Sequence, residues 1–96
     1  MDRTRIQSIV LDAVAQANQT RVAEQQLQVS PDAPLFGAPS PLDSLGLVAL
    51  LIDIEEAFGN EGHALVLSDE RAVSQSRSPF RSIPALVDYI EKLVSA

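Results

Sequence analysis

The sequence contains no cysteine and no tryptophan, and aromatic residues make up only 4% of it. Without cysteine, the chain can form neither a disulfide nor a thiolate metal site. Apolar residues nevertheless account for 46% of the 96 residues, so the core must be built mainly from leucine, isoleucine, valine and alanine. This length and composition predict a single domain that covers residues 1–96.

Long apolar runs are also missing from the sequence. None approaches the roughly 18 residues that a membrane-spanning helix needs. The N-terminus opens on a periodic pattern instead of the continuous apolar block of a signal peptide. We therefore expect a cytoplasmic protein that does not span a membrane.

Positive charge is absent from the middle of the chain. No lysine or arginine occurs between Arg21 and Arg71, whereas nine acidic residues lie in that stretch, and the whole chain has a net charge of −6. Nucleic-acid binding depends on cations that neutralise phosphates, so we expect no nucleic-acid partner. The acidic field favours partners with basic patches, although an acidic surface also aids solubility.

Three segments repeat apolar residues at spacings of three and four, which predicts amphipathic helices. They lie at residues 6–17, 44–58 and 83–94. Asp43 or Ser44 can cap the second helix, and Gly59-Asn60 is its expected end. Ser82 marks the start of the last helix, with Pro84 tolerated in its first turn.

The connections between these helices have their own signals. Residues 30–41 contain four prolines and a glycine, which predicts a loop, and Leu35 and Phe36 are its expected anchors to the core. Ser68-Asp69-Glu70 resembles the start of a short third helix. The expected fold class is therefore all-α, a small bundle of three longer helices and one short helix.

The second helix has two apolar stripes at about 100° per residue. The stripe formed by Leu47, Leu51, Ile54 and Phe58 is the expected core face. The opposite stripe suggests a docking surface, unless the helix is buried on both sides. Its residues and acidic rim are the expected contacts to partner proteins: Asp43, Leu45, Ala49, Ile52, Glu55 and Glu56.

Asp43-Ser44-Leu45, at the start of a predicted helix after a loop rich in proline, resembles the acyl and peptidyl carrier protein family. Residues 34–37, Pro-Leu-Phe-Gly, stand where the family often places a loop anchor. Residues 53–58 resemble the acidic end of its second helix, and residues 82–90 resemble its final helix. The likeness spans nearly the whole chain in order and spacing, and it implies the fold of an acyl carrier protein.

The resemblance implies that a phosphopantetheinyl transferase attaches 4′-phosphopantetheine from coenzyme A to the hydroxyl of Ser44. The thiol of this arm then holds an acyl cargo as a thioester and presents it to acyl-loading and acyl-processing enzymes of lipid, fatty-acid or secondary-metabolite biosynthesis. Pro41 replaces a usual glycine, and Gly46 and Ala49 replace positions that are often polar, which favours a specialised carrier. We expect a monomer, and the start at Met1 favours a free-standing protein.

The sequence also bears on catalysis, on metal binding and on other binding functions. Ser44 and His63, the only histidine, could form a catalytic pair, but the sequence shows no signature of an oxyanion hole or of the third residue of a catalytic triad. We therefore expect no enzyme. The acidic residues do not form a calcium-loop pattern, so we expect no metal site. A peptidyl, aryl or D-alanyl carrier stays open within the family. From another class, an unmodified acidic helical adaptor would use Ser44 only as a cap and bind basic protein surfaces through the Leu45 stripe.

Overall fold

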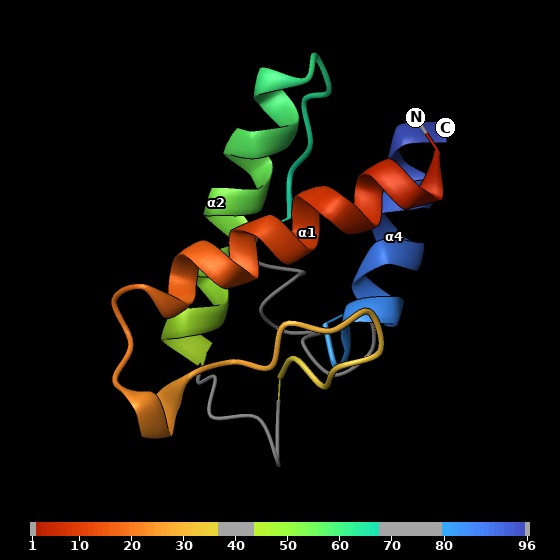
Figure 1. Cartoon of the computed structure of the whole chain (residues 1–96). Helices are drawn as coiled ribbons and strands as arrows, with labels where there is room; N and C mark the ends of the chain where they lie inside the picture. The colour runs from red at the N-terminus through yellow and green to blue at the C-terminus, as the bar shows by residue number, and fades with distance from the viewer. Residues whose placement is uncertain (1, 37–43, 68–79, 96) are drawn as a thin grey trace.

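A computed structural model describes residues 2–36, 44–67 and 80–95, with the side chains of Ser44 and Ser95 left out (Figure 1). Within these ranges the chain forms helix α1 (Arg3–Asn18), a short 3-10 turn η1 (Ala23–Gln25), helix α2 (Ser44–Asn60) and helix α4 (Ile83–Ser95). This confirms the expected all-helical class with three longer helices, and no strand occurs in the described part. The short helix expected from Ser68 lies outside the described residues.

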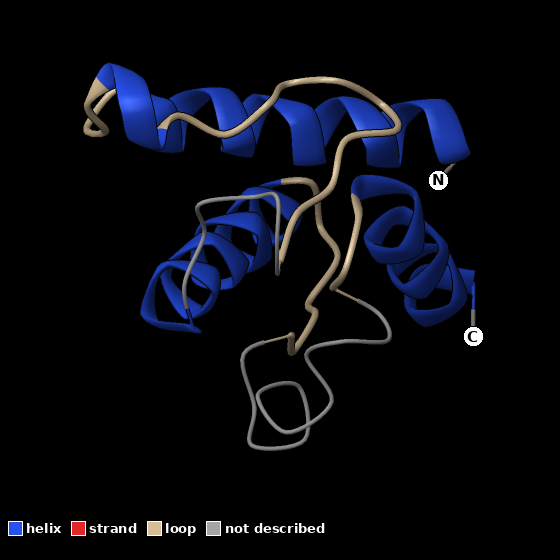
Figure 2. Ribbon diagram, turned by 90° about the horizontal axis from the view of Figure 1, so that it is seen from below, coloured by secondary structure: helices blue, strands red, loops and turns tan. Residues whose placement is uncertain are grey.

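Helix α1 lies across both other helices. It packs against α2 and against α4, and Figure 2 shows it as one layer above that pair. The reason is its apolar face, because the residues at three- and four-residue spacing are buried as predicted. These are Ile6, Ile9, Val10, Ala13 and Val14. Asp2 caps the helix, since its carboxylate accepts a 2.9 Å hydrogen bond from the backbone N–H of Arg5.

Loop residues complete the core between α2 and α4. The connecting segments run through this space in Figure 2, and their apolar side chains are buried with those of the helices. Leu35 is 1% exposed and Phe36 packs against the core, which confirms both expected anchors. The other buried loop residues are Leu27, Ala33, Leu67 and Phe80.

Two backbone hydrogen bonds join the loop before α2 to the start of α4. The N–H of Leu35 donates to the carbonyl of Arg81, and the N–H of Ile83 donates to the carbonyl of Ala33, each at 2.9 Å. These bonds flank an isolated antiparallel bridge between Pro34 and Ser82. Proline fits here because the bridged pair itself donates neither bond.

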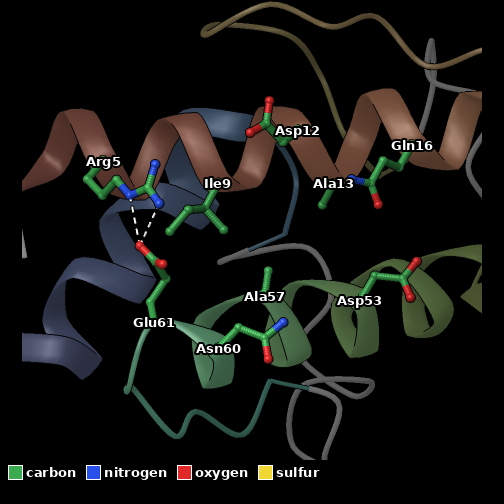
Figure 3. A pocket seen from close by; sticks show the side chains of 9 residues that line it. All are labelled: Arg5, Ile9, Asp12, Ala13, Gln16, Asp53, Ala57, Asn60 and Glu61. Carbon is green, nitrogen blue, oxygen red and sulfur yellow. Dashed lines mark hydrogen bonds and ion pairs between the residues drawn. The ribbon is translucent and has the colours of Figure 1, made fainter.

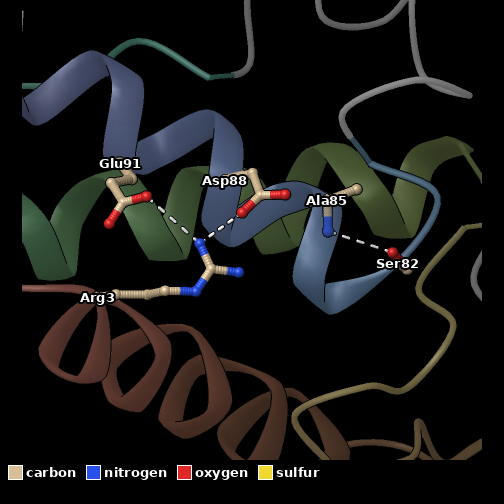
Figure 4. A network of polar contacts seen from close by, with 5 residues as sticks. All are labelled: Arg3, Ser82, Ala85, Asp88 and Glu91. Carbon is tan, nitrogen blue, oxygen red and sulfur yellow. Dashed lines mark hydrogen bonds and ion pairs between the residues drawn. The ribbon is translucent and has the colours of Figure 1, made fainter.

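Helix α4 begins at Ile83, directly after Ser82, which agrees with the predicted start. The side-chain oxygen of Ser82 accepts a 3.2 Å hydrogen bond from the N–H of Ala85, which is an N-cap contact (Figure 4). Pro84 lies in the first turn, where a helix has no N–H partner to lose. The buried face comprises Ile83, Leu86, Val87 and Ile90, whereas Leu93 is 37% exposed.

Salt bridges fix the N-terminal end of α1 to its neighbours. Arg3 contacts Asp88 at 2.5 Å and Glu91 at 3.4 Å on α4 (Figure 4), and Arg5 contacts Glu61 just after α2 at 2.6 Å. The hydrogen bond to Asp88 raises the pKa of Arg3 above its ordinary value. These exposed contacts orient the helices, whose stability rests on the apolar core.

Helix α2 ends at the expected Gly59-Asn60 pair. The helix continues to Asn60, and Gly62 adopts φ +86° just beyond it. The N–H of Gly62 donates to Gly59 at 3.1 Å, and the N–H of His63 donates to Phe58 at 2.9 Å. This pair of bonds is the Schellman arrangement, which places the left-handed glycine at position 62.

The two glycines should therefore respond in opposite ways to alanine. A new Cβ has no heavy atom within 4 Å at either site, so only the backbone conformation differs. Gly62→Ala should cost about 1–2 kcal/mol, because a left-handed conformation disfavours a side chain. Gly59→Ala should stabilise by roughly 0.5–1 kcal/mol, because alanine suits a helix interior. Thermal unfolding checks this pair, and a loss at Gly59 with none at Gly62 would contradict the observed helix end.

Candidate functional site

Helix α2 buries the stripe that periodicity predicts. Leu47, Leu51, Ile54 and Phe58 are each no more than 2% exposed. Leu50 is equally buried, although it was not among the expected core residues. It lies within about 60° of Leu47 on the helical wheel, so the core face is wider than the four-residue stripe.

The opposite stripe of α2 faces away from the core. Leu45 is 80% exposed and Ile52 is 49% exposed, and both Ala49 and Glu56 are also exposed. The alternative of a helix buried on both sides is therefore wrong for these residues. Exposed large apolar side chains that share one face form a surface suited to protein contact.

Ser44 is the first residue of α2. The backbone N–H groups of a first helical turn have no partners within the helix, and together with the helix dipole they favour a negative group nearby. The side chain of Ser44 and the whole of Asp43 lie outside the described residues, so which of the two caps the helix stays a prediction. Ser44 immediately precedes Leu45, the most exposed apolar residue of the outward stripe.

Glu55 does not belong to the outward stripe. It is partly buried, and its carboxylate accepts a hydrogen bond from the backbone N–H of Leu67. This contact ties residues 63–67 to α2, so Glu55 has a structural partner that sequence spacing does not reveal. Asp53 and Glu56 are exposed, and neither forms an ion pair with any described residue.

The structure does not bring Ser44 and His63 together. Helix α2 runs the whole way between them, and its 17 residues correspond to about 24 Å from first to last. His63 instead donates its backbone N–H to Phe58 in the turn that ends the helix. Within the described ranges, no three side chains of the kind that ligate metals gather at one point.

Truncation of the two stripes should separate stability from surface function. Leu51→Ala and Phe58→Ala should each lower the free energy of unfolding by about 2–5 kcal/mol, because they open cavities in the core. Leu45→Ala should cost less than about 0.5 kcal/mol, and Ile52→Ala at most about 1 kcal/mol, because both are largely hydrated already.

Thermal unfolding of these four variants gives the comparison. Equal losses in the two pairs would show that the outward stripe is part of the core, contrary to the exposure of Leu45 and Ile52. Circular dichroism before melting would serve as the control that each variant keeps its helical content.

The helices in the described ranges lack the combination of length and apolarity needed to cross a bilayer. Comparisons of the chain with protein-family models, with curated proteins and with solved structures found no match. The features that bear on function are therefore the residues and geometry of α2.

Proposed function

We propose that this protein is a specialised acyl carrier, which holds its cargo as a thioester on a 4′-phosphopantetheine arm attached to Ser44. The observation that carries the proposal is the coincidence of Asp43-Ser44-Leu45 with the N-terminal end of α2. The protein would have no catalytic activity of its own and would present the cargo to partner enzymes.

The local chemistry of the helix start supports this role. The arm is joined through a phosphate, and the N–H groups and dipole at a helix N-terminus stabilise a phosphate. A chain without cysteine has no thiol with which to form a thioester, and the arm would supply one. Ser44 would thus contribute the attachment oxygen, and the arm would contribute the reactive sulfur.

The outward stripe of α2 supports a partner that approaches Ser44. The transferase must reach the hydroxyl of Ser44, and the cargo enzymes must reach the arm attached there. Each of these partners therefore needs a binding surface close to Ser44. Leu45 and Ile52 offer exposed apolar area, and Glu56 adds negative charge at the same face. Apolar anchors supply affinity, whereas charges chiefly raise the rate of association with a basic partner.

The test is covalent modification. The purified chain incubated with coenzyme A and a phosphopantetheinyl transferase should gain the mass of one phosphopantetheine group, and Ser44→Ala should gain none. Ser8→Ala, a substitution on α1, is the matched control and should be modified like the unchanged protein. Intact-mass spectrometry measures all three.

Two results would contradict the proposal. Modification that persists in Ser44→Ala would place the arm on another residue. A folded protein that is never modified, with transferases of both the acyl and the peptidyl carrier type, would favour the unmodified acidic adaptor. Peptidyl, aryl and D-alanyl cargoes are distinguished afterwards by which loading enzyme charges the modified form.

A further inference from the structure

A groove runs between α1 and α2, on a side of α2 that meets the outward stripe at Glu56 (Figure 3). It has two adjoining compartments, of about 230 Å³ and about 460 Å³. The two compartments lie side by side along the helix pair, because they share four lining residues: Gln16, Asp53, Ala57 and Asn60. Both compartments are open to solvent, unlike the enclosed pockets that bury most of a small molecule.

The floor and the rim of the groove have different chemistry. Ile9 and Ala13 from α1, each 6% exposed, and the partly buried Ala57 from α2 form an apolar floor. Carboxylates and side-chain amides form the rim. These are Asp12 and Gln16 on α1, Gln19 just after α1, Asp53, Glu56 and Asn60 on α2, and Glu61 just after α2.

The chain already places one guanidinium in this groove. Arg5 donates from Nε at 2.9 Å and from Nη2 at 2.6 Å to the same carboxylate oxygen of Glu61, at one end of the groove (Figure 3). Beyond that pair, Asp12, Asp53 and Glu56 form no ion pair with a described residue. The rest of the groove therefore also presents carboxylates, as the end next to Arg5 does. No cation from the described part of the chain pairs with them.

We propose that the groove binds an arginine side chain presented by a partner protein. An aliphatic stem can lie on the apolar floor while its charged head stays at the hydrated rim. The guanidinium carries five N–H donors in a planar fork, which match a rim of carboxylate and amide oxygens better than the compact ammonium of lysine does. This surface is independent of Ser44 and would add a second contact, on the α1 side, to any partner of this protein.

The experiment uses the full chain labelled with nitrogen-15 and titrated with N-acetyl-arginine N-methylamide as the probe. Backbone amide signals of residues 12–16 and 53–57 should shift and saturate. The isosteric, uncharged N-acetyl-citrulline N-methylamide should leave them in place. Asp53→Asn should raise the dissociation constant of the probe by roughly two- to fivefold, as expected for the loss of one exposed ion pair.

Glu24→Gln is the matched control, because Glu24 is an exposed acid on η1 that does not line the groove, and it should bind the probe like the unchanged protein. Asp12→Asn provides a second variant should Asp53→Asn fail to fold. Absence of saturable shifts, equal shifts with the citrulline probe, or full affinity in both variants would overturn the proposal. Spermidine that binds at the same amides with equal or higher affinity would also contradict the proposal. The ligand of the groove would then be a free polyamine and not the arginine of a partner protein.

Discussion

The fold depends on one packing constraint, which is that a single helix must cover two others. Helix α1 lies across α2 and α4, and its buried face from Ile6 to Val14 serves both contacts. Between α2 and α4, buried loop side chains complete the core, chiefly Leu35, Leu67 and Phe80. Because helices of this length are marginal alone in water, the stability of all three rests on this shared core.

The same arrangement leaves part of α2 uncovered. The core stripe of α2 is buried in the core that it shares with α1 and the loops. The opposite stripe has no described element packed against it, and Leu45 is 80% exposed. Exposed apolar side chains that share one helix face are suited to contact with another protein. The stripe adjoins Ser44, so the proposed binding surface and the proposed attachment point share the first turns of one helix.

Periodicity predicted the helices and their buried faces well, because core packing and the helical repeat require the same apolar residues. It also predicted the exposed stripe of α2, which includes Ile52. The end of α2 at Gly59-Asn60 was also predicted, but only the backbone geometry shows that Gly62 is the glycine with positive φ. The contact of Glu55 with Leu67 joins residues far apart in sequence, so no local pattern predicts it.

The central claim is that Ser44 carries the arm in the living cell. Protein purified from its source cells and digested at aspartate yields a fragment of residues 43–52, in which Ser44 is the only serine. Tandem mass spectrometry of that fragment should find a phosphopantetheine group with fragment ions that locate it on Ser44. Native protein that is entirely unmodified, or that bears the group on any other residue, would contradict the account.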